Sequence, residues 1–286
     1  MRFDRVIILD WSAASAPSPR RPSADAIWLA EADARGENVQ YHRTRASAEA
    51  QLMGAIRAAH STGARLLIGC DFPFGYPAGF AAALTGQASA RAVWRYFAGE
   101  ITDSAANANN RFSVASTVNA QFGNGPFWGC PMGAQTAHLC AKKRVDYADL
   151  PFGERREVEK RIPSAQPVWK LFTTGSVGSQ SLMGLPMIHR LAQMRGVSVW
   201  PFDAPLSPIV LAEIYPSLLA REVAAAMAQQ GSDAIKDAVQ VQLLARALLG
   251  QSAASMAQML AVPNPLAREE GWILGAGFAA ELARAL

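Results

Sequence analysis

Two short apolar segments that each end in an aspartate place the strongest constraint on the fold of this chain. Residues 6–10 read Val-Ile-Ile-Leu-Asp, and residues 66–71 read Leu-Leu-Ile-Gly-Cys-Asp. Runs of this composition predict buried strands. A carboxylate at the end of a buried strand loses its hydration unless a positive charge meets it. If the two strands lie side by side, Asp10 and Asp71 indicate a divalent-metal site.

The order of the predicted elements favours a mixed sheet. Residues 26–30 and 39–42 predict a hairpin around Gly36. A helix is expected over residues 47–60, with Ser47 as its N-cap and Gly63 as its stop, before the strand that ends at Asp71. The sheet is therefore expected to begin antiparallel and to become parallel at this crossover.

The rest of the chain is expected to form a middle insertion and a second part of the core. We predict the parts 1–77, 78–200 and 201–286. The middle part contains expected helices over 88–100 and 181–195, a Gly/Asn/Ser-rich stretch over 103–135 and a charged segment over 142–161. Strands are expected at 197–200 and 209–214, and helices at 216–229, 232–249, 252–261 and after Leu274. The predicted class is α/β, a mixed sheet flanked by helices.

The positive charge of the chain is concentrated in its middle part. Residues 78–200 carry 13 basic and 7 acidic side chains, against 9 and 8 in residues 1–77 and 5 and 8 in residues 201–286. This distribution suits an anionic substrate that is held by the middle part and processed by the flanking parts. The alternative is that the basic residues only solvate a long insertion.

Composition predicts a soluble, cytoplasmic protein. No apolar run approaches the roughly 20 residues that span a bilayer, and the apolar stretch near the N-terminus is too short for a signal peptide. The 3 cysteines suggest no disulfide framework, as expected in a reducing compartment. We expect no membrane partner, and the oligomeric state is not predicted.

Two further acids lie where simple packing does not place them. Asp237 shares a helical stripe with Val241, Leu244 and Leu248, and Glu213 lies among apolar strand residues. Asp233, one turn before Asp237, is explained by the helix dipole, because an acid in the first turn is favourable.

Asp10, Asp71, Glu213 and Asp237 together suggest Mg²⁺ or Mn²⁺, since both metals prefer hard oxygen ligands. Such ions activate water and stabilise the leaving oxygen in phosphodiester cleavage. The alternative for each acid is a helix cap or a buried salt bridge.

The motifs around these acids resemble a known family. The segments Leu9-Asp10-Trp11-Ser12, Gly69-Cys70-Asp71-Phe72-Pro73, Glu213-Ile214-Tyr215-Pro216 and 233–238 are similar to domain-of-unknown-function family 429, a group of predicted nucleases with the RNase H-like fold. The resemblance implies that Asp10, Asp71 and Asp237 are the catalytic, metal-binding acids, and Glu213 matches the Glu-x-Tyr-Pro pattern of the family. The large insertion expected after the fourth strand departs from the minimal RNase H-like fold, so the resemblance implies nothing about how the substrate is recognised.

The function expected from this resemblance is an Mg²⁺- or Mn²⁺-dependent phosphodiesterase, a nuclease whose partner is a nucleic acid or nucleotide. Two other functions stay open. One is nucleotide binding, as in the actin-like ATPases that share the RNase H-like core, and the other is a non-catalytic protein of this fold. Some similar chains are described as associated with molybdopterin guanine dinucleotide synthesis.

The middle part contains candidates for substrate contacts. Residues 173–180 form a Gly- and hydroxyl-rich loop before a helix, where Ser176 and Ser179 are candidates for binding phosphate. An ordinary loop with an N-cap is the alternative. Arg111 and Lys170 are the predicted basic contacts. Aromatic residues of this part either stack on bases or form a core; they are Trp94, Tyr96, Phe97, Phe127, Trp128 and Trp169.

Overall fold

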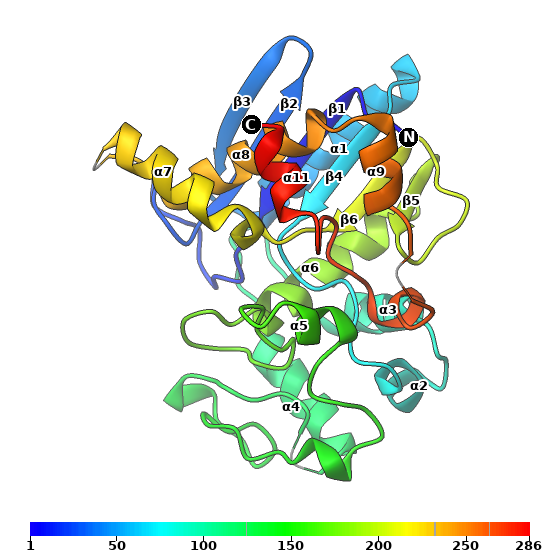
Figure 1. The fold of residues 1–286 in the computed structure, drawn as a ribbon. Coiled ribbons are helices and arrows are strands. Elements are labelled where there is room, and N and C mark those ends of the chain that lie inside the picture. Colours follow the sequence, from blue (N-terminus) through cyan, green and yellow to red (C-terminus); the bar gives the residue numbers. More distant parts are fainter. Residues whose placement is uncertain (124, 232, 263) are drawn as a thin grey trace.

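A six-stranded mixed sheet with helices on both faces organises the protein (Figure 1). The computed structural model describes residues 1–123, 125–231, 233–262 and 264–286. The strand order is β3-β2-β1-β4-β6-β5. The strands are β1 (Arg5–Asp10), β2 (Ile27–Asp33), β3 (Gly36–His42), β4 (Leu66–Cys70), β5 (Val197–Trp200) and β6 (Ile209–Glu213). β1, β2 and β3 pair antiparallel, and β1, β4, β6 and β5 pair parallel, which confirms the predicted change at the crossover.

The predicted hairpin forms, with longer strands than its apolar pattern indicates. The β2–β3 register extends from Ile27–His42 to Asp33–Gly36, so Gly36 begins β3 and is not the centre of the loop. The first three residues of β3 are exposed. Their side chains are polar or absent, and they therefore give no alternating pattern from which the strand could be predicted.

Helix α1 (Arg45–Thr62) connects β3 to β4 and covers one face of the sheet. It begins two residues before the expected start, because Thr44 and not Ser47 is the N-cap. The Thr44 hydroxyl accepts a hydrogen bond from the backbone N–H of Ser47. The hydroxyl of Ser47 instead lies 2.9 Å from Nδ1 of His42. The predicted stop is confirmed, since Gly63 has a left-handed φ of 69°.

The chain between β4 and β5 is mainly helical. Its helices are α2 (Phe80–Thr85), α3 (Ala90–Glu100), α4 (Arg111–Gln121), α5 (Glu157–Arg161) and α6 (Gly178–Leu191), with 3₁₀ turns η1 (Met132–Ala134) and η2 (Tyr147–Asp149). α3 and α6 are the two helices expected here. α4 was not predicted, because its β-branched and small polar residues have low helix propensity. β5 lies within the predicted middle part, but it pairs with β6 and belongs to the sheet.

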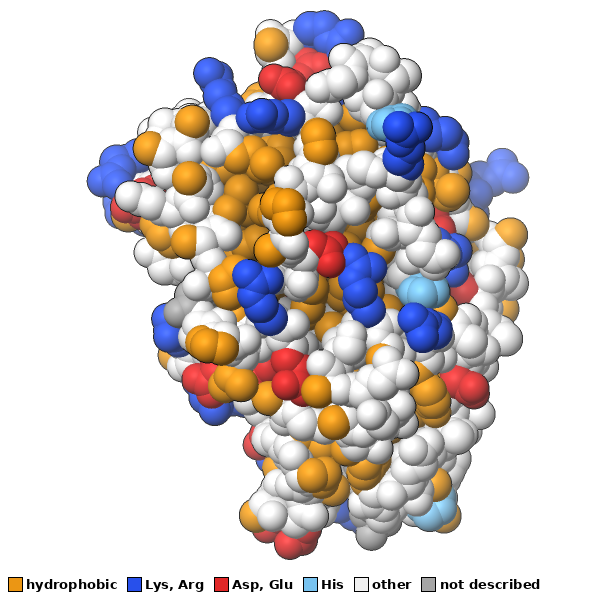
Figure 2. Space-filling model, turned by 90° about the vertical axis from the view of Figure 1, so that its right-hand side faces the viewer, with side chains coloured by type: hydrophobic (Ala, Val, Ile, Leu, Met, Phe, Trp, Pro, Cys, Tyr) orange, Lys and Arg blue, Asp and Glu red, His pale blue; other side chains and the backbone are white. Residues whose placement is uncertain are grey.

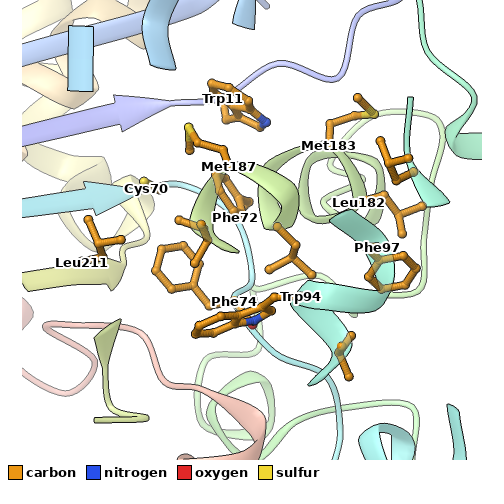
Figure 3. Packing of buried hydrophobic residues seen from close by; sticks show 14 of the residues in the cluster. Trp11, Cys70, Phe72, Phe74, Trp94, Phe97, Leu182, Met183, Met187 and Leu211 are labelled. Atoms are coloured by element: carbon orange, nitrogen blue, oxygen red, sulfur yellow. The ribbon is translucent and has the colours of Figure 1, made fainter. Parts of the chain in front are cut away.

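The middle part shares one continuous core with the α1 face of the sheet. Figure 3 shows Trp11 and Cys70, from the ends of β1 and β4, close to Phe72 and to Met187 of α6. Four of the predicted aromatic residues are buried in this core, namely Trp94, Phe97, Phe127 and Trp169. Tyr96 and Trp128 are partly buried against it. The core interpretation of these aromatic residues is therefore confirmed.

The C-terminal helices cover the opposite face of the sheet. They are α7 (Ala220–Gln230), α8 (Lys236–Leu249), α9 (Ala253–Met259), α10 (Ala267–Glu270) and α11 (Ala279–Arg284), and the 3₁₀ turn η3 (Pro216–Leu219) precedes α7. α8 packs on β1 and β2. It begins four residues after the expected start at Ser232, a residue outside the described ranges.

The molecular surface mixes charges of both signs. Figure 2 shows Lys and Arg side chains scattered among acidic and hydrophobic ones on one face of the protein. Among the described residues, no helix is long and apolar enough to cross a membrane.

Candidate functional site: an acidic cluster in a cleft

The carboxyl ends of β1 and β4 bring Asp10 and Asp71 together. The two strands are parallel neighbours in which Leu9 pairs with Cys70. Asp10, the last residue of β1, and Asp71, the first residue after β4, directly follow this pair. The backbone N–H of Asp71 donates a 2.9 Å hydrogen bond to the carbonyl of Leu9. The predicted adjacency of these two strand ends is confirmed.

Asp237 joins this pair from the first turn of α8. The helix packs on β1 and β2, and Val241, Leu244 and Leu248 of the predicted stripe are buried. Because α8 begins at Lys236, the first-turn acid is Asp237, whereas Asp233 precedes the helix and is exposed. The explanation by the helix dipole therefore applies to Asp237, and its assignment to Asp233 is wrong.

Asp25 is a fourth acid of the cluster and is not one of the acids predicted from the sequence. It precedes β2 and has a φ of 56°, and its backbone N–H donates a 2.8 Å hydrogen bond to Oδ2 of Asp237. A signal was present in the sequence. In an antiparallel neighbour of β1, the residues just before the strand lie at the same sheet edge as the residue that ends β1.

Burial and mutual repulsion raise the pKa values of the three predicted aspartates. Burial raises the pKa of Asp10 well above its ordinary value, and the charges of Asp71, Asp237 and Asp25 add to the effect. The pKa of Asp71 rises to about 7 through burial and then through Glu213 and Asp237. Burial also raises the pKa of Asp237. None of the ion pairs found among the described residues includes these three acids, so no salt bridge neutralises them within that part of the chain, and the nearby charge of Lys236 offsets only part of the rise in the pKa of Asp237.

Glu213, at the end of β6, has a different environment. Its two carboxylate oxygens each accept a 2.7 Å hydrogen bond from the guanidinium of Arg156, and Oε2 also accepts one from the backbone N–H of Phe74. Arg156 donates in addition to Glu159, and all three charged side chains are buried. The salt bridge, which was the alternative for each acid in the sequence analysis, is therefore what the structure contains at Glu213.

An open cleft of about 820 Å³ contains the aspartates and most of the predicted substrate contacts. Asp10, Asp25, Asp71 and Asp237 line it. Of the predicted contacts, Arg111, Ser176 and Ser179 line the same cleft. Lys170 is not among the lining residues, and its ammonium group donates a 2.8 Å hydrogen bond to the carbonyl of Thr174.

The loop that follows Asp10 forms one wall of this cleft and is held by Arg45. The buried guanidinium of Arg45 donates to the carbonyls of Ser12 and Ala14 at 3.0 and 2.7 Å. It also makes two 2.6 Å hydrogen bonds to the carboxylate of Asp103. All three guanidinium nitrogens of Arg45 are therefore used to fix this loop against the middle part of the chain.

No family model, curated protein or solved structure matches this chain. Among the described residues, no group of three or more His, Cys, Asp or Glu side chains is positioned to hold a metal ion as it stands. Mg²⁺ generally requires fewer protein ligands, because it keeps several waters and binds through one or two carboxylates together with substrate phosphates. The adjacent pair Asp10 and Asp71 offers that number of carboxylates.

Proposed function

We propose that the protein is an Mg²⁺- or Mn²⁺-dependent phosphodiesterase, a nuclease whose site has the RNase H-like arrangement of acids. Asp10 and Asp71 supply the metal-binding oxygens, and Asp237 is the third acid of the site, in the same cleft. The observation that carries the proposal is that acids from two adjacent strand ends and one helix share a cleft and form no salt bridge among the described residues. A divalent cation would relieve the repulsion that raises their pKa values.

The residues present fit such an ion by the chemistry of their donors. Carboxylate oxygens are the ligands that Mg²⁺ and Mn²⁺ prefer, and the bound ion supplies Lewis acidity and an activated water. Asp25 holds the carboxylate of Asp237 by its backbone N–H. Glu213 is left out of the proposed ligands, because Arg156 already binds both of its oxygens.

The first experiment measures metal binding. Protein dialysed against EDTA is titrated with Mn²⁺ by isothermal calorimetry, as wild type and as Asp10→Asn, Asp71→Asn and Asp237→Asn. Asp33→Asn is the matched control. Asp33 ends β2, far along the strand from Asp25, and its carboxylate accepts a hydrogen bond from Arg35. We expect Asp10→Asn and Asp71→Asn to lose Mn²⁺ binding, Asp237→Asn to weaken it, and the control to retain it. Equal binding by Asp10→Asn and Asp33→Asn would contradict the proposed site.

The second experiment measures cleavage of fluorescently labelled DNA and RNA, single- and double-stranded, with Mg²⁺ or Mn²⁺. Asp10→Asn is expected to reduce the rate by at least about 100-fold, because metal activation of water and stabilisation of the leaving oxygen contribute several kcal/mol. A cleavage rate in Asp10→Asn equal to that of the wild type would contradict the proposed function. Thermal stabilisation by nucleotides without any cleavage would instead favour the nucleotide-binding alternative.

A further inference from the structure

Arg111, the first residue of α4, places a positive charge in the acidic cleft. Its Nε donates to the hydroxyl of Ser179 at 3.1 Å. Its Nη1 donates to Ser15 Oγ at 2.9 Å and to Asn109 Oδ1 at 2.7 Å. All three acceptors are neutral. Among the described residues, no hydrogen bond from Nη2 and no ion pair of Arg111 is found, so the guanidinium keeps a donor and its charge for another group.

Other arginines inside this protein are paired with carboxylates. Arg45 is bound to Asp103, and Arg156 is bound to Glu213 and Glu159. Burial lowers the pKa of Arg111 to about 10, and the charge of Arg45 contributes to the effect. An anion bound at Arg111 would offset this cost, which is a physical reason to expect a ligand there.

An exposed aromatic ring lies on the same wall of the cleft. Phe172 lines the cleft and is 41% exposed. Of the most exposed large hydrophobic side chains among the described residues, it is the only aromatic one; the others are Met132, Leu266 and Leu286. The aromatic residues that the sequence suggested for stacking are buried or partly buried, whereas Phe172 presents an accessible ring.

Arg111 and Phe172 are held in one structural unit. The Arg111 guanidinium carbon lies 4.3 Å from the centre of the Phe112 ring, and that ring packs edge to face on Phe172 with 6.5 Å between centroids. The buried Ser179 hydroxyl accepts from Arg111 and donates a 2.6 Å hydrogen bond to the carbonyl of Leu171, the residue before Phe172. The role of Ser179 in this arrangement is to position the other two residues.

We propose that this wall of the cleft binds one unpaired nucleotide of the substrate, with Arg111 on its phosphate and Phe172 stacked on its base. The inference rests on the proposed function, since it places the neighbouring phosphodiester toward the aspartates. A volume of about 820 Å³ is within the usual range for small-ligand sites. A base can stack on Phe172 only when it is unpaired, so the substrate class is single-stranded nucleic acid.

The proposal is tested by fluorescence anisotropy with short labelled thymidine oligonucleotides in Ca²⁺, with gel analysis to verify that the probes stay intact. A probe with abasic positions and a duplex of the same length are measured in parallel. The variants are Phe172→Ala, Arg111→Gln and Arg111→Lys. The controls are Met132→Ala, an exposed apolar side chain outside the cleft, and Arg221→Gln, which removes an exposed basic side chain of α7 that does not line the cleft.

We expect Phe172→Ala to weaken binding of the thymidine probe by about 5- to 100-fold and to leave binding of the abasic probe unchanged. Arg111→Gln should weaken both probes and make the slope of log K against log salt shallower by about 0.7, the value for one phosphate contact. Arg111→Lys should restore that slope. If Arg111→Gln fails to fold, the affinities of Phe172→Ala for the thymidine and abasic probes still show whether a base stacks on Phe172.

The inference would be overturned if Phe172→Ala bound the thymidine probe as tightly as Met132→Ala does, or if the wild type bound the duplex as tightly as the single strand. Its failure is distinct from that of the proposed function. If oligonucleotide binding depends on Arg111 and Phe172 but no metal-dependent cleavage is found, the nucleotide site is supported and the phosphodiesterase activity is contradicted. Cleavage with unchanged KM in both variants would leave the phosphodiesterase and remove the nucleotide site.

Discussion

The backbone N–H of Asp25 donates a 2.8 Å hydrogen bond to Oδ2 of Asp237, across 212 positions of the chain. This bond joins the residues before β2 to the first turn of α8. It also brings a second carboxylate to the Asp237 side of the cluster, and that charge raises the pKa values of both Asp10 and Asp237.

The left-handed backbone at Asp25 gives a first prediction. Asp25→Asn and Asp25→Gly should both raise the stability of the metal-free protein, because each removes a repulsive charge and tolerates a φ of 56°. Asp25→Ala should be about 1 kcal/mol less stable than Asp25→Asn, since alanine is strained in this conformation. Urea denaturation of the three variants and the wild type measures their free energies of unfolding. An alanine variant as stable as the asparagine one would contradict the backbone assignment.

A second prediction concerns the pH dependence of the metal-free protein. Because the pKa of Asp71 is about 7 in the folded state, against 3.8 as its ordinary value, the folded state holds this proton over a range where the unfolded chain has lost it. The free energy of unfolding should therefore fall as pH rises from about 4 to about 7, by up to about 4 kcal/mol. Denaturation in EDTA across this range measures the effect. Asp71→Asn should make this fall less steep, with the contribution of Asp10 remaining, and an equally steep curve in that variant would exclude Asp71 as its cause.

The buried triad of Arg156, Glu159 and Glu213 gives a third prediction. Arg156→Met leaves two buried glutamates without their counter-charge and should cost about 3–5 kcal/mol at neutral pH. Glu159→Gln should cost less, because Arg156 keeps its pair with Glu213. Chemical denaturation of both variants gives the comparison. A larger loss in Glu159→Gln would show that Arg156 is not the centre of this network.

A fourth prediction uses two glycines in helices. A Cβ at Gly184 in α6 would overlap ring carbons of Phe72, whereas one at Gly54 in α1 would meet nothing within 4 Å. Gly54→Ala should stabilise the protein by about 0.5–1 kcal/mol, and Gly184→Ala should destabilise it. Thermal unfolding of both variants is the test. Stabilisation by both would mean that α6 and Phe72 are not in close contact.

Most of the sheet could be predicted from the sequence, because five of its strands are largely apolar and are separated by clear turn signals, whereas the exposed first residues of β3 carry no such pattern. The Asp10–Asp71 pair followed from the same pattern, since parallel strands end at one edge. The environment of Glu213 could not be predicted, because Arg156 lies in a charged segment whose tertiary position no local pattern indicates. The place of Asp25 at the sheet edge follows from the hairpin, but its contact with Asp237 does not, and no pattern indicates the exposure of Phe172. Each lies in a loop, where conformation depends on contacts with distant residues.

The position of α8 across β1 and β2 has a consequence for how the protein folds. Until this helix has been synthesised, the sheet face that it covers exposes Val6, Ile8 and Trp28 to water. Contacts between residues so distant in sequence form slowly, and an uncovered apolar face favours aggregation during synthesis. On a ribosome, the nascent chain therefore needs protection of this face until α8 has emerged. Asp237 belongs to the same helix, so the acidic cluster is completed only when that face is covered.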